Sequence, residues 1–485
     1  MKISRKVVIV GGGISGLAAV YRLKELGQKT GQPFEIVLAE ATSRLGGVIE
    51  SRAQDGFLLE GGPDSFISEK PAARELSDRL GIASEIIGTN NKFRRSFIYK
   101  KGKLIPIPEG YYLIAPSRIS AFLMTPLLNW GTKFRVGCEL FISKRKSAGD
   151  ESVGGFVRRR FGETTLQEIA QPMIGGIYTA DPEFLSLETT LPQFLDLERQ
   201  YGSVIRGLIT RKRLRLKPAA QTASGPRYSL FLSFREGMES LTRSISAQLP
   251  EVTFRMNAPV AEVWPHSGKW KIAFRHREVL EADVVCIALS AFQAAPLLSR
   301  AAPDLSRDLE NVPYESVATI NLAYKRSDIP HPLNGFGFVV PAITGRKIVA
   351  CSFSSVKFAG RAPRDMALLR VFAGGALHRE VYAMDDKALE RTVLEELRHY
   401  LGIKAPPLFS SIKRYPNTMP QYRVGHLELM KTVQSKLAAF PGLYLVGNAY
   451  RGIGVPDCIK WSELTAESIA QFLEERERLP VLEVP

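Results

Sequence analysis

The chain has few cysteines and no long apolar run, and both features limit the classes of protein to which it can belong. Four cysteines, at positions 138, 286, 351 and 458, are scattered over 485 residues without a C-x-x-C pair. Such isolated thiols fit a reducing compartment and exclude a small disulfide framework. No stretch reaches the roughly 18 apolar residues that a membrane span needs. Residues 1–5 lead directly into an apolar strand, so we expect no signal peptide and a cytoplasmic protein.

Histidine and acidic residues are also scarce. None of the six histidines stands at ligand spacing from another, so we expect no metal site. The 49 acidic residues are outnumbered by 65 basic ones, which gives a net charge of +16 and suits an anionic partner. No nucleic-acid-binding signature is present, so we expect no nucleic-acid partner. The basic clusters at 144–146, 158–160 and 206–217 are each interpreted as solvated surface.

The N-terminal sequence carries a nucleotide-binding motif. An apolar strand at 6–10 breaks into Gly11, Gly13 and Gly16 and then continues with helical spacing. Gly11 permits the tight turn, Gly13 lets the backbone approach a pyrophosphate, and Gly16 allows the helix to pack closely on the sheet. The phosphate then meets free N–H groups at the helix N-terminus. Strand, glycine turn and helix in this order predict a Rossmann phosphate site.

Further motifs follow in the order that an extended dinucleotide requires. A second strand at 34–39 ends in Glu40, whose carboxylate can accept hydrogen bonds from both ribose hydroxyls of an adenosine. Arg44 can neutralise a diphosphate, and Gly46 and Gly47 let the chain pass close to the ligand. The segment 60–66, EGGPDSF, adds a third glycine site. Together these motifs predict FAD rather than NAD.

The C-terminal segment, GLYLVGNAYRGIGVPDC and the residues after it, repeats the order of strand, glycine-rich loop and helix. Gly447, Asn448 and Gly454 stand where the chain must approach a ligand closely. In FAD oxidoreductases of two domains, a helix beginning at Val455 would aim its N-terminus at the flavin ring and stabilise negative charge on the reduced form. We therefore predict one discontinuous domain built from both ends of the chain, the alternative being an ordinary βα unit.

The middle of the chain has other patterns. We predict a hairpin over 96–108, a helical unit over 117–171, a strand, turn and helix between 226 and 249, and an antiparallel run in 252–276. A parallel strand at 284–289 follows, and then a mostly antiparallel sheet over 317–408 with one helix at 386–401. The apolar segment 119–130, flanked by Arg118, Lys133 and Arg135, has two interpretations: an amphipathic face that rests on anionic lipid, or a buried domain core.

At nearly full length the sequence resembles the oxygen-dependent protoporphyrinogen and coproporphyrinogen oxidases, within the amine-oxidase-like FAD superfamily. The superfamily shares GGGISGLAA and EATSRLGG. The motifs particular to porphyrinogen oxidases are EGGPDSF, ESVGGFVRRRFGE, PMIGGIYTADPEFLSL, MPQYRVGH and YLVGNAYRGIGVPD. GPDSF and the termini are most similar to the monofunctional bacterial branch, in which coproporphyrinogen III is often the substrate.

The resemblance implies a mixed α/β and α+β fold of three domains. They are a discontinuous Rossmann-like FAD-binding domain (1–90, 235–300 and 438–485), a substrate-binding domain on the antiparallel sheet (91–110, 186–234 and 301–437), and a helical domain (111–185), which docks on the bilayer in membrane-associated relatives. It also implies three two-electron oxidations of a porphyrinogen, each passing hydride to N5 of noncovalent FAD, with O2 as the final acceptor and H2O2 as product. The protein then needs to orient a methylene bridge and exclude water, without a catalytic triad.

The resemblance and the motifs together predict two sets of site residues. In the substrate set, Arg95 anchors a propionate, with Arg94 as the alternative. Gly175, Gly176 and Ile177 form a loop over the pocket. Phe338 and Phe353 are predicted as apolar walls of the pocket, the alternative being that they are core residues. The cofactor set is Gly11, Gly13, Ile14, Ser15, Gly16, Glu40, Arg44, Leu45, Gly46, Gly47, Gly61, Gly62, Pro63, Asp64, Val260, Gly447, Asn448, Gly454, Val455 and Pro456.

One loop departs from the family pattern. Where relatives have Gly-aliphatic-Tyr-Ala-Gly-Asp, this chain reads Gly176-Ile-Tyr-Thr-Ala180-Asp181. Alanine in place of glycine is costly wherever φ is positive, so we expect the loop to take another path, which also puts inhibitor sensitivity in question.

Other classes stay open at this point. A flavin amine oxidase or a carotenoid desaturase shares the N-terminal motifs, although the cationic middle favours neither, and a non-catalytic flavoprotein is the remaining alternative. The sequence does not decide which porphyrinogen is used, whether the chain forms a homodimer, whether it hands product to a downstream enzyme of haem synthesis, or whether it sits peripherally at the inner face of the membrane.

Overall fold

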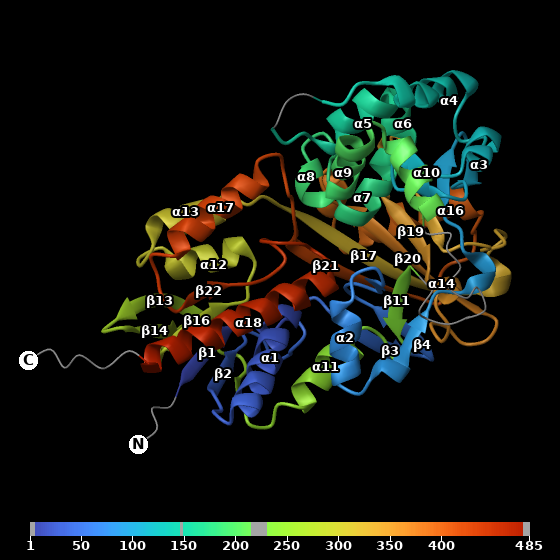
Figure 1. Ribbon diagram of the computed structural model, residues 1–485. Coiled ribbons are helices and arrows are strands. Elements are labelled where there is room, and N and C mark those ends of the chain that lie inside the picture. The colour runs from blue at the N-terminus through green and yellow to red at the C-terminus, as the bar shows by residue number, and fades with distance from the viewer. Residues whose placement is uncertain (1–4, 146–148, 215–229, 479–485) are drawn as a thin grey trace, which may run out of the picture.

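Figure 1 shows the computed structural model, which describes residues 5–145, 149–214 and 230–478. A five-stranded parallel sheet forms the lower left part, and its strand order is β12-β2-β1-β16-β22. Short apolar runs form these strands because both faces of the sheet are covered. Their bounds are β1 Lys6–Val10, β2 Glu35–Ala39, β12 Thr253–Arg255, β16 Val284–Ile287 and β22 Leu443–Leu445.

Alternate residues of β1 point into two different cores. Val7 and Ile9 are buried with the helices of one face, whereas Val8 and Val10 are buried with those of the other. On the first face lie α1 (Ile14–Thr30), α2 (Ala72–Arg79), α11 (Glu239–Ala247) and α18 (Val455–Arg478). On the second lie α12 (Ala291–Leu298), α13 (Pro303–Glu310), α17 (His426–Leu437) and an antiparallel sheet of β13 (Val260–His266), β14 (Lys269–Phe274) and β15 (Val279–Ala282).

One predicted strand pairing is wrong. The sequence placed 252–256 in an antiparallel run with the two strands that follow, but β12 pairs parallel with β2. Thr253, Phe254 and Arg255 lie opposite Val37, Leu38 and Ala39 in this ladder. A strand of three residues carries too little pattern to specify its partner, so tertiary contacts decide it.

A seven-stranded sheet forms the second unit, in the order β21-β17-β20-β19-β18-β7-β8, and all neighbours pair antiparallel except β18 and β7. The predicted hairpin and helix are confirmed as β7–β8 and α16. Asp385 caps α16 by accepting a hydrogen bond from Ala388 N at 2.8 Å, and Gly402 ends it with φ of 72°. The bounds are β7 Phe97–Lys100, β8 Lys103–Pro106, β17 Tyr314–Lys325, β18 Gly337–Val339, β19 Ala350–Phe353, β20 Met366–Gly374, β21 Phe409–Pro420, α14 Ser354–Lys357, α15 Arg379–Tyr382 and α16 Asp386–Leu401.

A helical unit lies at the top of Figure 1. The hydrophobic core of this unit contains residues from 114–185 together with Leu187, Phe194 and Val204. The helical unit therefore continues beyond residue 185, where the sequence placed its boundary. The helices are α3 (Ile119–Met124), α4 (Trp130–Gly137), α5 (Val153–Phe161), α6 (Glu163–Thr165), a π-helix (Leu166–Ala170), α7 (Gln171–Tyr178), α8 (Leu187–Thr190), α9 (Pro192–Tyr201) and α10 (Val204–Leu214).

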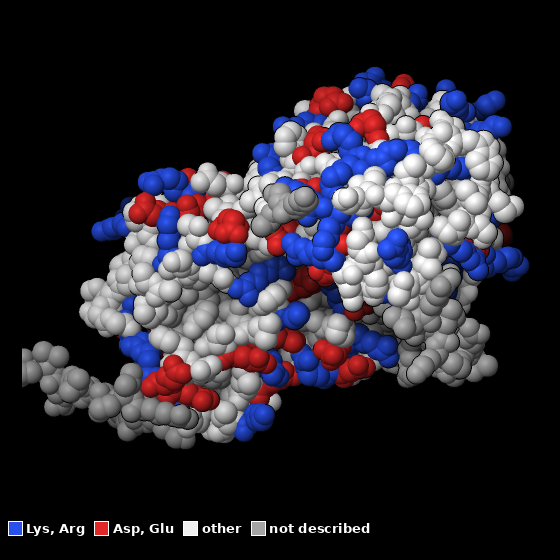
Figure 2. Space-filling model, turned by 45° about the horizontal axis from the view of Figure 1, so that its top comes forward, with Lys and Arg blue, Asp and Glu red and all other residues white. Residues whose placement is uncertain are grey.

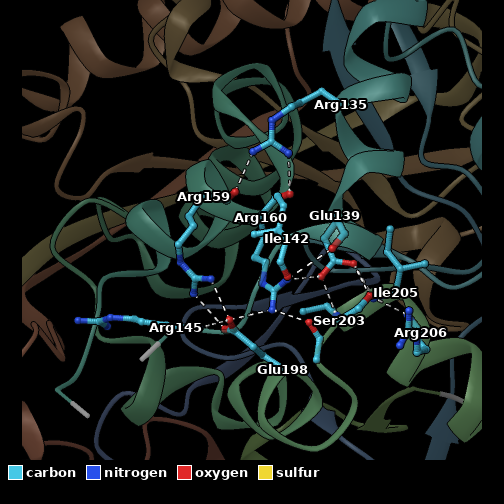
Figure 3. A network of polar contacts seen from close by, with 12 residues as sticks. Arg135, Glu139, Ile142, Arg145, Arg159, Arg160, Glu198, Ser203, Ile205 and Arg206 are labelled. Atoms are coloured by element: carbon cyan, nitrogen blue, oxygen red, sulfur yellow. Dashed lines mark hydrogen bonds and ion pairs between the residues drawn. The ribbon is translucent and has the colours of Figure 1, made fainter. Parts of the chain in front are cut away.

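The basic cluster at 158–160 is not simply solvated surface. Arg160 is fully buried and pairs with Glu139 at 3.2 Å and Glu198 at 2.8 Å (Figure 3). Arg159 pairs with Glu198 as well, at 2.8 Å, whereas Arg158 pairs with Glu163 at the surface. Within the described part of the 206–217 cluster Arg206 and Arg211 are exposed; Arg215 and Lys217 lie outside the described residues.

Short elements connect the units. Two-residue to four-residue strands are β3 (Ser51–Gln54), β4 (Phe57–Glu60), β5 (Phe66–Ile67), β6 (Ile86–Gly88), β9 (Tyr111–Tyr112), β10 (Ala115–Pro116) and β11 (Phe231–Phe234), and 3-10 turns cover Ala83–Glu85, Asn91–Phe93, Cys138–Phe141, Arg326–Asp328 and Ala342–Thr344. No helix among the described residues combines the length and the apolar character needed to cross a bilayer.

Candidate functional site

The glycine turn after β1 leaves no room for side chains. Gly11 has φ of 110°, and a Cβ there would lie 2.5 Å from the carbonyl oxygen of Ala288 on the neighbouring strand connection. A Cβ on Gly16 would overlap the carbonyl oxygen of Gly11. Helix α1 begins at Ile14 without a side-chain cap at Gly13 and without an acidic residue in its first turn. Its first N–H groups, with those of Ser15 and Gly16, are therefore suited to a phosphate.

The second glycine loop lies against the first. Gly46 N donates to Gly12 O at 2.8 Å, and a Cβ on Gly47 would stand 3.1 Å from the Cα of Gly13. Leu45 packs on the core beneath α1. The two loops thus form one narrow cradle of backbone, which is the shape that an extended dinucleotide needs.

Glu40 and Arg44 stand beside this cradle. One oxygen of Glu40 accepts from Gly12 N at 2.8 Å, and the other accepts from Thr42 N and Thr42 Oγ1 at 2.9 and 2.8 Å. The Glu40 carbonyl accepts from Ala258 N at 2.8 Å, two residues before Val260. Arg44 donates to the carbonyls of Leu45, Ile49 and Gly47, so its guanidinium holds its own loop. The predicted contact of Arg44 with a diphosphate stays a prediction.

The third glycine loop is held by the inner face of the seven-stranded sheet. Arg370 donates to the carbonyls of both Gly61 and Gly62, the former at 2.8 Å. Thr319 Oγ1 donates to Gly61 O at 2.9 Å, and Asn321 Nδ2 donates to Glu60 O at 3.1 Å. Sequence reasoning missed these three residues. The sequence did contain a signal for them, because they are polar residues at alternate positions of strands that are otherwise apolar.

Two carboxylates flank this loop, the buried Glu60 and the half-buried Asp64, and they differ in charge state. Burial raises the pKa of Glu60 to about 7, although Ser51 Oγ and Met238 N donate to its oxygens at 2.6 and 2.9 Å. Burial also opposes ionisation of Asp64, but Lys357 at 3.0 Å and Arg370 outweigh it and hold the pKa of Asp64 well below its usual range. Asp64 is therefore a fixed anion, whereas Glu60 titrates near neutrality.

The C-terminal glycine loop meets the start of α18. Gly447 and Gly452 have φ of 139° and 127°, and a Cβ on Gly452 would lie 2.6 Å from Asp457 Cγ. Asn448 Nδ2 donates to Thr418 O at 3.2 Å. Helix α18 begins at Val455, and its first turn holds Asp457, which pairs with Lys70 at 2.6 Å. The Lys70–Asp457 ion pair neutralises the carboxylate at the N-terminus of α18. This terminus also has one N–H fewer, because Pro456 has none.

The anchor residue predicted for a propionate is exposed. Arg95 Nε donates to Asn334 O at 2.7 Å, and its guanidinium lies 5.8 Å from the centre of the Phe97 ring. Arg94 is also exposed. Both residues precede β7, which lies next to the edge strand β8 of the seven-stranded sheet.

The predicted pocket loop is a helix. Gly175, Gly176 and Ile177 lie in α7, and a Cβ on Gly176 would lie 3.2 Å from Val339 Cγ1 of β18. Small residues here therefore let a helix approach a strand. The left-handed residue is Thr179, with φ of 51°, whereas Ala180 is buried and does not have positive φ. The steric cost that the sequence assigned to Ala180 is thus not present at that residue.

Phe338 and Phe353 are core residues and are not retained as pocket walls. Their rings are 6.1 Å apart, and Phe338 lies 4.9 Å from Tyr400 of α16. Side chains alternate along a strand, so both rings point to the α16 face, and Val339 and Ser352 occupy the opposite face. The sequence could not assign the face, because a period-two pattern shows which residues share a face but not what covers that face.

These cradles fit FAD. A Cβ on Gly11, Gly16 or Gly62 would collide with backbone, and one on Gly47 would be tightly packed against it. The N-terminus of α1 has no side-chain cap, and Glu40 supplies a carboxylate at the end of β2. The fold and this site define a flavin-dependent oxidoreductase. The chain belongs to the family described as flavin containing amine oxidoreductase, whose model matches residues 14–470, and its cofactor is FAD.

Among its relatives, the chain is 31% identical to coproporphyrinogen III oxidase of Bacillus subtilis, over 97% of this chain and 98% of the relative. It is 33% identical to coproporphyrinogen III oxidase of Propionibacterium freudenreichii, over 96% and 90%. It is also similar to a crystal structure from Exiguobacterium sp. 255-15, described as a candidate protoporphyrinogen oxidase, with a TM-score of 0.84, 31% identity and coverage of 97% and 99%.

Proposed function

We propose that the chain is a porphyrinogen oxidase of haem biosynthesis, which converts coproporphyrinogen III, protoporphyrinogen IX or both to the porphyrin and releases H2O2. The observation that carries this proposal is similarity over almost the whole chain to coproporphyrinogen III oxidases, together with a complete flavin cradle. When bound, noncovalent FAD supplies the hydride acceptor and passes electrons to O2. The relatives at 31–33% identity are named coproporphyrinogen III oxidase, whereas the structurally similar putrescine and cyclohexylamine oxidases are 16% identical to this chain.

The chain's own part in this reaction is positioning. The Gly61–Gly62 carbonyls are fixed by Arg370, and α7 lies close on β18 because Gly176 has no side chain. Arg95 offers an exposed guanidinium before β7 for a carboxylate of the substrate. Orientation and exclusion of water are the contributions that such an arrangement makes to hydride transfer.

The deciding experiment compares two substrates. The purified protein with FAD is given coproporphyrinogen III and protoporphyrinogen IX separately, and porphyrin fluorescence and O2 uptake are followed. We expect porphyrin from at least one of them, with about three O2 consumed per porphyrin formed, since each two-electron step needs one O2. Bound FAD that neither porphyrinogen reduces would reject the proposal and favour a non-catalytic flavoprotein.

Charge favours the tetracarboxylate. The net charge of +16 should steer coproporphyrinogen III, with four carboxylates, more strongly than protoporphyrinogen IX, with two. Exposed charges are screened over about 8 Å at 0.15 M ionic strength, so added salt should lower kcat/KM more for the former. An equal fall for both substrates contradicts the charge argument while leaving the oxidase activity itself intact.

The helical unit also offers a surface for peripheral membrane contact. Part of the segment 119–130 is buried core and part of it is exposed apolar surface. Phe122, Leu127 and Leu128 lie in the core, while other apolar residues of the segment are exposed. Figure 2 shows a broad uncharged area on this side of the molecule, with Lys and Arg around it. The exposed large apolar side chains of residues 119–141 are Ile119, Leu123, Met124, Trp130, Phe134, Leu140 and Phe141.

The flanking cations contribute less than the sequence suggested. Lys133 is buried, donates to Leu123 O at 2.7 Å and lies 4.5 Å from the Trp130 ring centre. Arg135 donates to the carbonyls of Arg159 and Arg160 at the end of α5. Of the three predicted cations, Arg118 is the exposed one. We therefore infer that membrane contact rests on apolar side chains more than on charge, on a protein located in the cytoplasm. A homodimer and a downstream partner enzyme stay predictions.

A further inference from the structure

A short segment after β21 connects the helical unit to the C-terminal flavin loop. We call residues 420–426 the strap. On one side it pairs with the helical unit: Ser186 N donates to Tyr422 O at 2.7 Å, and Val424 N donates to Phe184 O at 3.0 Å. These bonds flank a bridge between Leu185 and Arg423. The backbone of the strap is thus fixed to residues 184–186.

The other side of the strap reaches the flavin loop through one side chain. The Tyr422 hydroxyl donates to Asn448 O and accepts from Gly452 N at 2.8 Å. It therefore joins two backbone groups at the two ends of the loop 448–452, which lies between Gly447 and α18. Tyr422 is 3% exposed, so water does not replace these bonds.

The surroundings of Tyr422 keep its hydroxyl protonated and its ring in a fixed position. Burial raises the pKa of Tyr422 well above its usual value, so the hydroxyl keeps its proton and can both donate and accept. The ring stacks on His426, with centres 4.2 Å apart and planes 19° apart. Burial lowers the pKa of His426 to about 4, although the backbone at Ala449 and Tyr450 opposes this shift, so the stacked imidazole is neutral.

The loop needs such a tie. Gly447 and Gly452 both have positive φ, and the side chain of Asn448 is bonded to Thr418 O in the sheet unit. Glycines with positive φ also favour many other conformations, so a loop that contains them is ordered mainly by its contacts. Without the Tyr422 hydroxyl, Gly452 N and Asn448 O would each lose a buried partner.

We propose that Tyr422 is a positioning residue for FAD. Its hydroxyl fixes the loop 448–452 that forms the C-terminal half of the flavin site, and the strap ties the geometry of that loop to the helical unit. This assigns a role to MPQYRVGH, a motif whose chemistry the flavin cradle and the substrate residues leave unexplained. The inference rests on flavin binding and not on the identity of the substrate, so it can fail without the proposed activity failing.

The test replaces Tyr422 by phenylalanine, which keeps the ring and its stacking. Tyr444→Phe is the matched control, since the Tyr444 hydroxyl bonds to Ser468 O on α18 at 3.4 Å and does not touch the loop. For Tyr422→Phe we expect the dissociation constant for FAD to rise about tenfold, the cost of leaving buried backbone groups unpaired. We also expect a changed visible absorption spectrum of the bound flavin, which a loss of general stability would not produce.

Hydrogen exchange tests the tie to the helical unit. In the holoprotein, the amide of Gly452 should exchange faster in Tyr422→Phe, and so should those of Ser186 and Val424, while Tyr444→Phe should match the wild type. An FAD dissociation constant within about twofold of the control, with an unchanged spectrum, overturns the positioning role. Faster exchange confined to Gly452 overturns the tie.

A second variant decides the matter if Tyr422→Phe does not fold. His426→Leu keeps the hydroxyl of Tyr422 but removes the ring on which it stacks. We expect weaker FAD binding in the same direction and by a smaller factor than for Tyr422→Phe. A folded His426→Leu protein with wild-type FAD affinity, spectrum and exchange contradicts the proposal.

Discussion

Glu40 is the residue on which the adenosine end of the flavin site depends most directly. It lies at the end of β2 and binds the first glycine loop through Gly12 N. Replacement by alanine removes both the ribose acceptor and this tie, so we expect FAD affinity to fall at least about tenfold and the flavin to be lost on gel filtration. Glu35→Ala is the control, because Glu35 at the start of the same strand is 47% exposed and pairs with Lys6. A yellow Glu40→Ala protein with full flavin content would reject this placement.

The raised pKa of Glu60 leads to a prediction of how the free energy of unfolding depends on pH. Its folded pKa of about 7 is above the ordinary 4.5, so the folded state binds the proton more tightly than the unfolded state. The resulting stability is complete below pH 4.5 and declines as pH rises through 7, by up to about 3 kcal/mol. Glu60→Gln has no such titration. Denaturant unfolding at pH 5 to 8 should therefore show the wild type losing stability relative to the variant, and a constant difference between them would be the contrary result.

Arg95 tests the anchoring of the substrate. A propionate anchor acts in the ground state and the transition state alike, so Arg95→Ala should raise KM for both porphyrinogens severalfold with little change in kcat. FAD content should stay normal, because the side chain lies before β7 and bonds to Asn334 O. Arg94→Ala is the comparison. If that variant raises KM while Arg95→Ala behaves as wild type, the anchor is Arg94.

At the scale of single elements, α5 contains a buried arginine, Arg160, and an exposed one, Arg158, two positions apart. Arg160 lies between Glu139 and Glu198 with no exposure, and Glu139 also accepts from Val204 N at 2.8 Å at the start of α10 (Figure 3). Arg160→Met leaves Glu139 buried without its cation and leaves Glu198 with Arg159 alone, and breaking such a buried pair costs about 3–5 kcal/mol. Arg158→Met breaks exposed pairs with Glu163 and Glu183, worth about 0–1 kcal/mol each.

Thermal unfolding of the holoprotein distinguishes these two variants. We expect the midpoint to fall by several degrees for Arg160→Met and to change little for Arg158→Met. Equal midpoints would show that the buried network does not hold the helical unit together. Flavin absorbance, recorded in the same scan, shows whether this unit and the flavin site unfold together.

Elements also show what the sequence can and cannot predict. The bounds of α16 follow from local signals, the cap at Asp385 and the glycine at 402, and β1 follows from an apolar run before a glycine turn. The partner of β12 and the face occupied by Phe338 depend on contacts with residues far away in sequence. The glycine loops of the site were predictable because close approach to backbone demands glycine. Arg370 was not predicted, because its role needs the sheet to be folded against the loop.

At the scale of the whole molecule, three units meet on the flavin site. The parallel sheet supplies the first glycine turns, the seven-stranded sheet holds Gly61 and Gly62 through Arg370, and the strap connects the helical unit to the loop 448–452. Loops fixed from several sides reorganise little when a reaction occurs, which favours electrostatic and geometric preorganisation.

The apolar surface of the helical unit gives the last prediction. Trp130, Phe134 and Phe141 are 72%, 76% and 87% exposed, and aromatic side chains of this kind insert at the headgroup boundary of a bilayer. We expect the wild type to co-sediment with anionic vesicles and the double variant Trp130→Ser, Phe141→Ser to bind at least about fivefold less. Ile343→Ser, an exposed apolar residue of the sheet unit, is the control. Since Lys133 and Arg135 are engaged inside the protein, raising the salt should weaken binding only modestly. Absence of wild-type binding, or an equal loss in the control, would show that this surface does not contact lipid.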